Sequence, residues 1–215
     1  MSRPSRNVDQ LLLQAGLTLL PQTGMRGLSI RQVTEKAGVN LGMFHYHFKT
    51  KDAFVRTILD QKYNDMFTSL TLVSHGAESA VEKLRAAVTV LARFGRDNRV
   101  LLVRLIGDAL AGEAAAAEFM RANLPRHLGV IIALVAQAQR DGAIRKLPAA
   151  QAVAFLMGGV GAPILLGTAA TNSGLAPVAL GRALQESIFS DTAIAKRVDM
   201  ALAGLAAPKK TGVRK

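Results

Sequence analysis

Two helix-capping signals close together in the N-terminal quarter constrain the fold more than any other feature of this sequence. In the segment LSIRQVTEKAGV, residues 28–39, Gln32 stands three positions after Ser29. At this spacing each of the two side chains can accept a hydrogen bond from the free backbone N–H of the other residue, an arrangement called a capping box. Gly38 stands at the other end, where helices commonly close in the left-handed conformation. The segment therefore predicts a short helix that ends in a tight turn.

A second short helix is predicted directly after that turn. Asn40 is a good N-cap for a helix that runs to about Phe48, and Thr50 caps a further helix that has Asp52 near its positive end. Two short helices joined by a turn that contains glycine form a helix-turn-helix. This motif can place its second helix in the major groove of DNA.

The rest of the chain is also predicted to be helical. Apolar residues recur at helical spacing from Val8 to about Gln22, and Thr23-Gly24 supplies a stop. Further helices are expected over residues 51–72, 79–97, 100–112, 114–140, 148–170, 178–189 and 192–206. We therefore expect an all-α protein with a helix-turn-helix domain at 1–50, a connecting helix at 51–72, a second helical domain at 73–207 and a basic disordered tail at 208–215.

Composition agrees with a buried helical core and with a polyanionic partner. Of the 215 residues, 50% are hydrophobic, 20% are charged and only 5% are aromatic, a balance that favours helices over sheets. The net charge of +12 predicts binding to nucleic acid or to an acidic membrane surface. The lack of cysteine excludes disulfides and cysteine-bound metals and fits a reducing compartment. Because the N-terminus shows no signal-peptide pattern, we expect a cytoplasmic protein.

One uncharged run could suggest a membrane span. The segment AVAFLMGGVGAPILLGTAA, residues 152–170, is uniformly small or apolar and about long enough to cross a bilayer. Its four glycines and Pro163 make a poor isolated helix, and aromatic anchors are missing at both ends. Small residues also allow a second helix to approach closely. We therefore favour a buried helix at an oligomer interface and keep a membrane-associated helical protein as an alternative.

Two histidines in NLGMFHYHFKTKD, residues 40–52, could suggest a metal or catalytic site. His45 and His47 are two positions apart, so on a helix their side chains diverge and do not share the face that an i, i+4 metal pair needs. The other histidines, His75 and His127, lie in unrelated segments. No carboxylate or nucleophile stands at a spacing that would activate either ring. We therefore expect no metal site, no cofactor and no enzymatic activity.

The same short helix suits a DNA groove. Phe44 and Phe48 can face inward and hold the helix on its neighbours, while other positions project outward. A glycine permits close approach to a duplex, aliphatic groups can touch thymine methyls, and a His or Tyr side chain can bond a phosphate or a base edge. Lysines before the next helix and a basic N-terminal arm would hold the phosphate backbone. The predicted DNA-contacting residues are Arg3, Arg6, Leu41, Gly42, Met43, His45, Tyr46, Lys49 and Lys51.

The N-terminal region resembles the DNA-binding domain of the TetR family of transcriptional regulators. The resemblance runs from residue 8 to residue 59 and rests on the AGV turn, the glycine two places after Asn40, the aromatic-rich short helix and HFKTKD. It implies a homodimer whose two recognition helices enter successive major grooves of a palindromic double-stranded DNA operator. It also implies that the family's DNA-contacting positions are occupied by Ser29, Arg31, Leu41, Gly42, Met43, His45, Tyr46 and Lys51.

One position departs from the family pattern. The family usually has a phosphate-binding Tyr where this chain has His45, so the contact is kept by imidazole, is weaker, or becomes sensitive to pH. Leu41 and Met43 stand where polar base readers are common. They indicate readout by methyl contact and DNA shape more than by bidentate hydrogen bonds.

The resemblance further implies that the C-terminal helices bind a small-molecule effector and form the dimer interface. The helices near 148–170 and 192–206 have the apolar faces that a helix bundle between subunits needs, although either could pack within its own subunit. The available lining favours a hydrophobic or aromatic effector. The candidate ligand-binding residues are Phe94, Arg104, Asp108, Phe119 and Met120.

Arg104 is unusual because it lies on an otherwise apolar helix. It either forms an ion pair with Asp108, one turn later, or meets a carboxylate or phosphate of the effector. The ion pair is the simpler interpretation.

These features predict a ligand-responsive DNA-binding regulator, most simply a repressor that leaves its operator when the effector binds. The alternative is a non-specific nucleic-acid-binding protein that depends on charge alone. In support of the alternative, residues 1–60 hold eight Lys or Arg and four Asp or Glu, so +8 of the net +12 lies beyond them.

Overall fold

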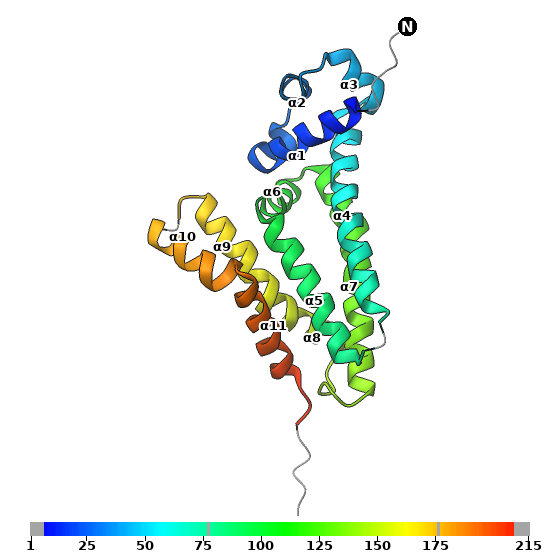
Figure 1. Cartoon of the computed structure of the whole chain (residues 1–215), viewed down its shortest axis with the longest axis vertical. Helices are drawn as coiled ribbons and strands as arrows, with labels where there is room; N and C mark the ends of the chain where they lie inside the picture. Colours follow the sequence, from blue (N-terminus) through cyan, green and yellow to red (C-terminus); the bar gives the residue numbers. More distant parts are fainter. Residues whose placement is uncertain (1–6, 77, 176, 209–215) are drawn as a thin grey trace, which may run out of the picture. The chain divides into compact units, whose positions relative to one another are not determined.

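The computed structural model describes residues 7–76, 78–175 and 177–208. This part of the chain is almost entirely helical and contains no β-strand, so the predicted all-α fold is confirmed (Figure 1). Arg3, Arg6 and all but the first residue of the predicted tail at 208–215 lie outside the described residues.

Packing divides the chain into two compact units. Unit 1 consists of the described residues up to Asp65 and Val100–Asn123, and unit 2 consists of Met66–Arg99 and the described residues from Leu124 onward. This division differs from the linear one that the sequence suggests near residue 73. The reason is that a segment from the middle of the chain packs with the N-terminal helices, a pairing that no local composition signal records.

Unit 1 is built from the N-terminal helices and one later segment, Val100–Asn123. Its elements are α1 (Val8–Gly27), α2 (Ile30–Ala37), α3 (Leu41–Phe48), the first part of α4 (Lys51–Ser74), nearly all of α6 (Arg99–Leu110) and the first part of α7 (Ala114–Arg140). The three helices α1, α2 and α3 contact one another, which is the arrangement of a helix-turn-helix domain.

The predicted caps of α2, α3 and α4 are present. Ser29 and Gln32 form both bonds of the capping box, and Gly38 closes α2 with φ of 67°. The Asn40 side chain accepts a hydrogen bond from the Met43 backbone N–H at 3.0 Å. The Thr50 hydroxyl oxygen likewise accepts the Ala53 N–H at 3.1 Å. These bonds satisfy donors that a helix start leaves free, so they fix where each short helix begins.

An aromatic cluster holds α3 on the rest of unit 1. Phe44 and Phe54 are completely buried, and their ring centroids lie 5.1 Å apart in an edge-on arrangement. Phe48 also meets Phe54, at 4.9 Å. Helices α1 and α4 approach closely at Gly16, where an added Cβ would lie 2.5 Å from Ile58 Cδ1. The predicted inward orientation of Phe44 is thus confirmed, and Phe48 is half-buried beside it.

Unit 2 is a bundle in which the last helix packs along earlier ones. It contains the ends of α4 and α7, and α5 (Ala80–Asp97), α8 (Ala149–Leu156), η1 (Met157–Gly161), α9 (Ala162–Asn172), α10 (Val178–Leu184), η2 (Gln185–Phe189) and α11 (Asp191–Leu205). Helix α11 lies along α5 and α8 (Figure 1). Arg93 and Arg96 of α5 both bond the Asp191 carboxylate, and the hydrogen bond from Arg96 holds the pKa of that carboxyl below its ordinary value.

The uncharged run forms one continuous helix from Ala149 to Asn172, with a π-helical stretch in its middle. By length and composition it is the one helix in the described residues that could cross a membrane. One of its faces is buried in unit 2 and packs on α5 and α11. The other face is apolar but exposed at Phe155 and Leu166, the latter 69% exposed. The run is therefore partly core and partly an uncovered apolar surface.

Candidate nucleic-acid interface

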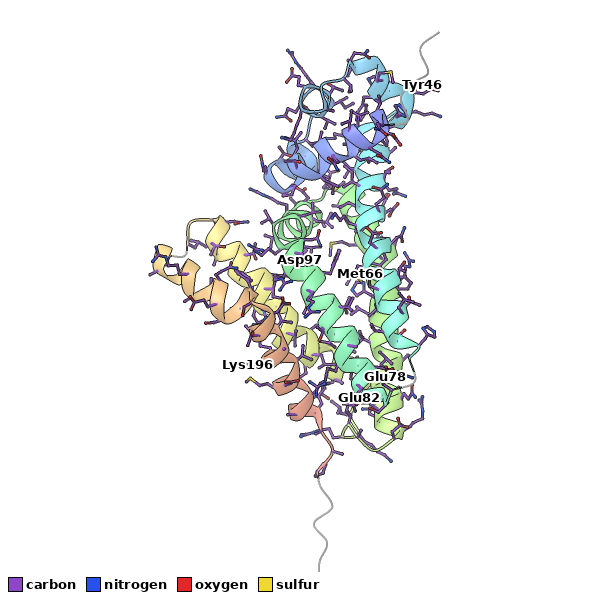
Figure 2. The ribbon with its side chains drawn as sticks, in the orientation of Figure 1. Tyr46, Met66, Glu78, Glu82, Asp97 and Lys196 are labelled. Carbon is purple, nitrogen blue, oxygen red and sulfur yellow. The ribbon has the colours of Figure 1, made fainter. Side chains whose placement is uncertain are left out.

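Helix α3 presents an exposed outer face on the side opposite its aromatic anchor. Tyr46 is 72% exposed and Leu41 is 52% exposed, and Figure 2 shows the Tyr46 side chain pointing away from the helices of unit 1. Gly42 and His45 are also exposed, so positions three and four apart share this face. The predicted outward orientation of Met43 is wrong: Met43 is half-buried and packs against the core of unit 1, so it lies at the edge of this face.

Two residues on and before α2 were also predicted to contact DNA. The Ser29 hydroxyl donates to Gln32 Oε1 at 3.0 Å as part of the cap, although the side chain itself is exposed. Arg31 is exposed and its Nε lies 2.8 Å from Glu35 Oε1. An exposed ion pair of this kind stabilises little, so the Arg31 guanidinium can exchange Glu35 for a phosphate at small cost.

Lys51 has a structural contact that the sequence did not reveal. Its Nζ donates to the Met25 carbonyl oxygen at 3.0 Å, and the side chain is half-buried. This bond ties the start of α4 to the end of α1. An ammonium group has three donors, so Lys51 can hold Met25 and still donate to a phosphate.

The other side of the same peptide segment is held by α6. Asp108 Oδ2 accepts the Met25 backbone N–H at 2.7 Å. Gly24, with φ of 67°, allows this approach, because an added Cβ would lie 2.9 Å from Asp108 Oδ2. The predicted ion pair between Arg104 and Asp108 is wrong: within the described part of the chain the two residues are not paired, and Arg104 is exposed.

A second unpredicted feature lies at the end of α3. Lys49 is the one non-glycine residue with positive φ in the described ranges, at φ 61° and ψ −56°. The Thr50 N–H donates to the Phe48 carbonyl oxygen at 2.6 Å, which closes a tight three-residue turn. His45 Nδ1 lies 3.1 Å from the Lys49 carbonyl oxygen, so the His45 ring pins this turn. No sequence pattern in this segment points to such a turn.

The predicted effector residues do not gather in one unit. Phe94 belongs to unit 2, whereas Arg104, Asp108, Phe119 and Met120 belong to unit 1. Phe119 lines a cavity of about 150 Å³ in unit 1, beside Met25, Leu59 and the Arg56–Glu118 ion pair. A cavity of that size can hold a benzene-sized molecule, whereas most ligand pockets are larger. Asp108 already bonds Met25, and Phe119 and Met120 pack partly against the unit 1 core.

These observations define a helix-turn-helix DNA-binding protein: two short capped helices, an exposed recognition face and lysines at its end. The family model for bacterial regulatory proteins of the tetR family matches residues 12–58, the stretch that contains α2 and α3. Residues 12–58 are therefore similar to the DNA-binding domain of the TetR family. The family is one of transcriptional regulators and not of enzymes.

Similar proteins extend the comparison. The chain is 29% identical over 83 residues to the HTH-type transcriptional repressor KstR2 of Mycolicibacterium smegmatis, a match that covers 39% of this chain and 40% of that protein. It is 32% identical over 79 residues to KstR2 of Rhodococcus jostii, covering 36% and 38%. The chain therefore matches less than half the length of these relatives.

A solved structure is similar over nearly the whole length. The ketosteroid transcriptional regulator KstR2 of Mycobacterium tuberculosis superposes with a TM-score of 0.69 at 14% identity, and the match covers 96% of this chain and 98% of that one. At this identity the likeness establishes the fold, which includes the helical C-terminal region.

Proposed function

We propose that this protein is a transcriptional repressor that binds a palindromic operator as a homodimer and is released by a small hydrophobic or aromatic effector. The observation that carries the proposal is the outer face of α3, which joins Leu41, His45 and Tyr46 to Lys49 on a helix capped at both ends. The names of the KstR2 relatives, which are repressors, support the same role. Because its target is chromosomal DNA, we place the protein in the cytoplasm.

Selection from a randomised pool of DNA duplexes tests sequence specificity. A regulator is expected to enrich one sequence with two related half-sites, because a symmetric dimer repeats its recognition helix. The alternative, a non-specific nucleic-acid-binding protein, would enrich nothing and would bind every duplex with equal affinity at physiological salt. That result would reject the proposed repressor.

Changes on the outer face of α3 are expected to weaken DNA binding without unfolding the protein. Replacing Tyr46 with alanine should weaken binding to the selected duplex roughly 10- to 100-fold if it reads a base or phosphate. Replacing Lys49 with alanine should weaken binding to all duplexes and reduce the slope of log K against log salt by about 1. Gel-shift titrations at several salt concentrations measure both effects.

Lys146 provides the matched control for the lysine change. It is exposed in unit 2 between α7 and α8, outside both α3 and the proposed dimer interface, so replacing it with alanine removes the same charge without touching either surface. Equal losses for the Lys49 and Lys146 variants would mean that overall charge, and not the α3 surface, drives binding. Lys51 is less suitable for this test because it also bonds Met25.

The dimer interface is proposed to lie on the exposed face of Ala149–Asn172 and on α11. The apolar surface around Leu166 on α9 and the 72% exposed Met200 on α11 support this location. Packing of the opposite face on α5 and α11 favours a protein interface over a membrane span, because it anchors this helix in a folded bundle.

Replacing Leu166 with aspartate is expected to separate the subunits. A carboxylate buried without a partner at an interface costs about 3 kcal/mol or more, which raises the dimer dissociation constant on the order of 100-fold. Sedimentation equilibrium measures this change. Replacing Leu72 with aspartate is the control, because Leu72 is 72% exposed on α4 and lies outside the proposed interface. A Leu166 variant that remains as dimeric as the Leu72 variant would rule out this surface.

The effector is proposed to be small and hydrophobic or aromatic. Phe119 and Met120 of unit 1 support this class because each is apolar and only partly buried, as pocket-lining residues are. Phe94 lies in unit 2 and adds no support. Arg104 is exposed and unpaired among the described residues, so its guanidinium is available to an acidic group on the effector. Asp108 is the weakest member of the set, since its carboxylate already accepts the Met25 N–H.

A further inference from the structure

We infer that His45 binds a DNA phosphate only as the doubly protonated imidazolium, so that operator binding takes up a proton at this residue. The inference rests on the proposed function, since it concerns the contact that α3 makes with DNA. It follows from the direction of one hydrogen bond at the end of α3.

The bond between His45 and Lys49 fixes which ring nitrogen carries hydrogen. Nδ1 of His45 lies 3.1 Å from the carbonyl oxygen of Lys49. A carbonyl oxygen only accepts hydrogen bonds, so Nδ1 must be the donor. A neutral imidazole has a single N–H. In the neutral ring, Nε2 therefore carries a lone pair and can only accept.

This tautomer is held in place by the turn that it pins. Lys49 N–H donates to the His45 carbonyl oxygen at 3.2 Å, and His45 Nδ1 returns a bond to the Lys49 carbonyl oxygen. The pair of bonds holds Lys49 at φ 61° and ψ −56°, a conformation that non-glycine residues rarely adopt. Exchanging the hydrogen to Nε2 would break the second bond and release this turn. Neutral His45 thus offers DNA an acceptor and not a donor.

The position of His45 favours a phosphate as its partner. In helix-turn-helix complexes the first residues of the recognition helix contact base edges, whereas flanking positions contact the backbone. His45 lies in the second half of α3 and shares the outer face with Lys49. A phosphate oxygen is a negatively charged acceptor, and the Nε2 lone pair would face it unfavourably. Only a second proton, on Nε2, turns this ring into a phosphate donor.

In the part of the chain that the structure describes, no charged side chain is bonded to the His45 ring. The elements packed on α3 are α1, α2 and α4. The ring contacts the Lys49 carbonyl and an edge-on Phe44 ring. The titratable and charged groups on α1, α2 and α3, at Lys49 and in the first two turns of α4 are Asp9, Arg26, Arg31, Glu35, Lys36, Tyr46, His47, Lys49, Lys51, Asp52 and Arg56.

Calorimetry of the full-length protein with its selected duplex tests the inference. Titrations at about pH 7.5, where an ordinary histidine is mostly neutral, are run in buffers of low and high ionisation enthalpy, and the difference gives the protons taken up. Wild-type protein is expected to take up as much as one proton per subunit. The affinity of the wild-type protein for the duplex should fall about tenfold for each unit by which the pH rises, per proton taken up.

Two variants isolate His45. His45→Tyr supplies a hydroxyl donor that needs no added proton, and His45→Asn can keep the donor to the Lys49 carbonyl but does not titrate. Both are expected to bind with the His45 share of proton uptake gone. Uptake that is as large in either variant as in the wild type, or no uptake by the wild type, would overturn the inference. If the wild type binds tightly without taking up protons, neutral His45 instead accepts a hydrogen bond from the amino group of a base.

The position of the hydrogen on the neutral His45 ring can also be tested without DNA. Nitrogen-15 spectra of labelled histidine distinguish the two tautomers, and the expected result is hydrogen on Nδ1 of His45 in the free protein at high pH. Hydrogen on Nε2 would overturn the inference even if DNA binding is normal. Failure of wild type and both variants to bind any duplex would reject the proposed function, and the inference with it.

Discussion

Replacing Phe44 with alanine is expected to lower the free energy of unfolding by about 3–5 kcal/mol, the usual cost of removing a fully buried phenylalanine. Phe44 is 0% exposed and its ring meets those of Phe48 and Phe54, so the change leaves a cavity at the base of α3. A helix of eight residues has little stability of its own and depends on this packing. DNA binding should therefore be lost together with the fold of the helix-turn-helix. Denaturant unfolding followed by circular dichroism measures the stability.

Tyr46 is the matched control, because it is an aromatic residue on the same helix with its side chain in solvent. Replacing Tyr46 with alanine should change the free energy of unfolding by no more than about 0.5 kcal/mol while still weakening DNA binding. Comparing the two variants therefore distinguishes residues that pack α3 against unit 1 from residues that α3 exposes to solvent. Equal destabilisation by the two changes would contradict the packing of α3 described above.

Replacing Asp108 with alanine is expected to cost about 1.5–3 kcal/mol of stability, because the Met25 N–H loses a charge-assisted partner. The bond between Asp108 and Met25 is 2.7 Å long and joins residues 83 positions apart. It fixes α6 to the segment that leads into α2. Its loss should also loosen the entry to the helix-turn-helix, which native-state hydrogen exchange of residues 25–40 would detect as faster exchange.

A double-mutant cycle with Gly24 tests the same contact from the other side. Replacing Gly24 with alanine places a Cβ 2.9 Å from Asp108 Oδ2 in a left-handed backbone conformation. Gly112 provides the control, because its φ is 86° and an added Cβ meets nothing within 4 Å, so alanine there incurs only the backbone cost of about 1–2 kcal/mol. The Gly24 change should cost more than this in the wild type and clearly less once Asp108 is alanine. Additive costs would mean that Asp108 does not contact this segment.

The parts of the fold that sequence predicts well are those set by near neighbours. The caps at Ser29 and Asn40 depend on residues a few positions apart, and each lies where it was predicted. The predicted stop at Gly24 is only a break in helical geometry, because α1 continues to Gly27. The exposed positions of α3 follow in the same way from its helical period. Met43 differs, because it packs against the buried cluster of unit 1 and is half-buried.

The parts that sequence did not predict depend on distant residues or on unusual backbone geometry. A carboxylate one turn from an arginine suggests an ion pair, yet Asp108 instead bonds a backbone N–H far away in the chain. The sequence predicts Lys51 only as a phosphate contact, because its bond to Met25 depends on the packing of α4 against the end of α1. The tight turn at Lys49 uses a conformation that lysine rarely adopts, so no residue preference could indicate it.

The composition of unit 1 has a practical consequence for chimeric regulators. Its core includes Leu101, Leu105 and Ala116, which come from α6 and α7 and not from the first four helices. A fragment cut after α4 would therefore expose the surfaces that these side chains cover. Grafting this DNA-binding head onto another sensor should succeed only when residues 100–123 travel with it. The interchangeable module is thus two stretches of chain, and exchange by a single crossover would divide it.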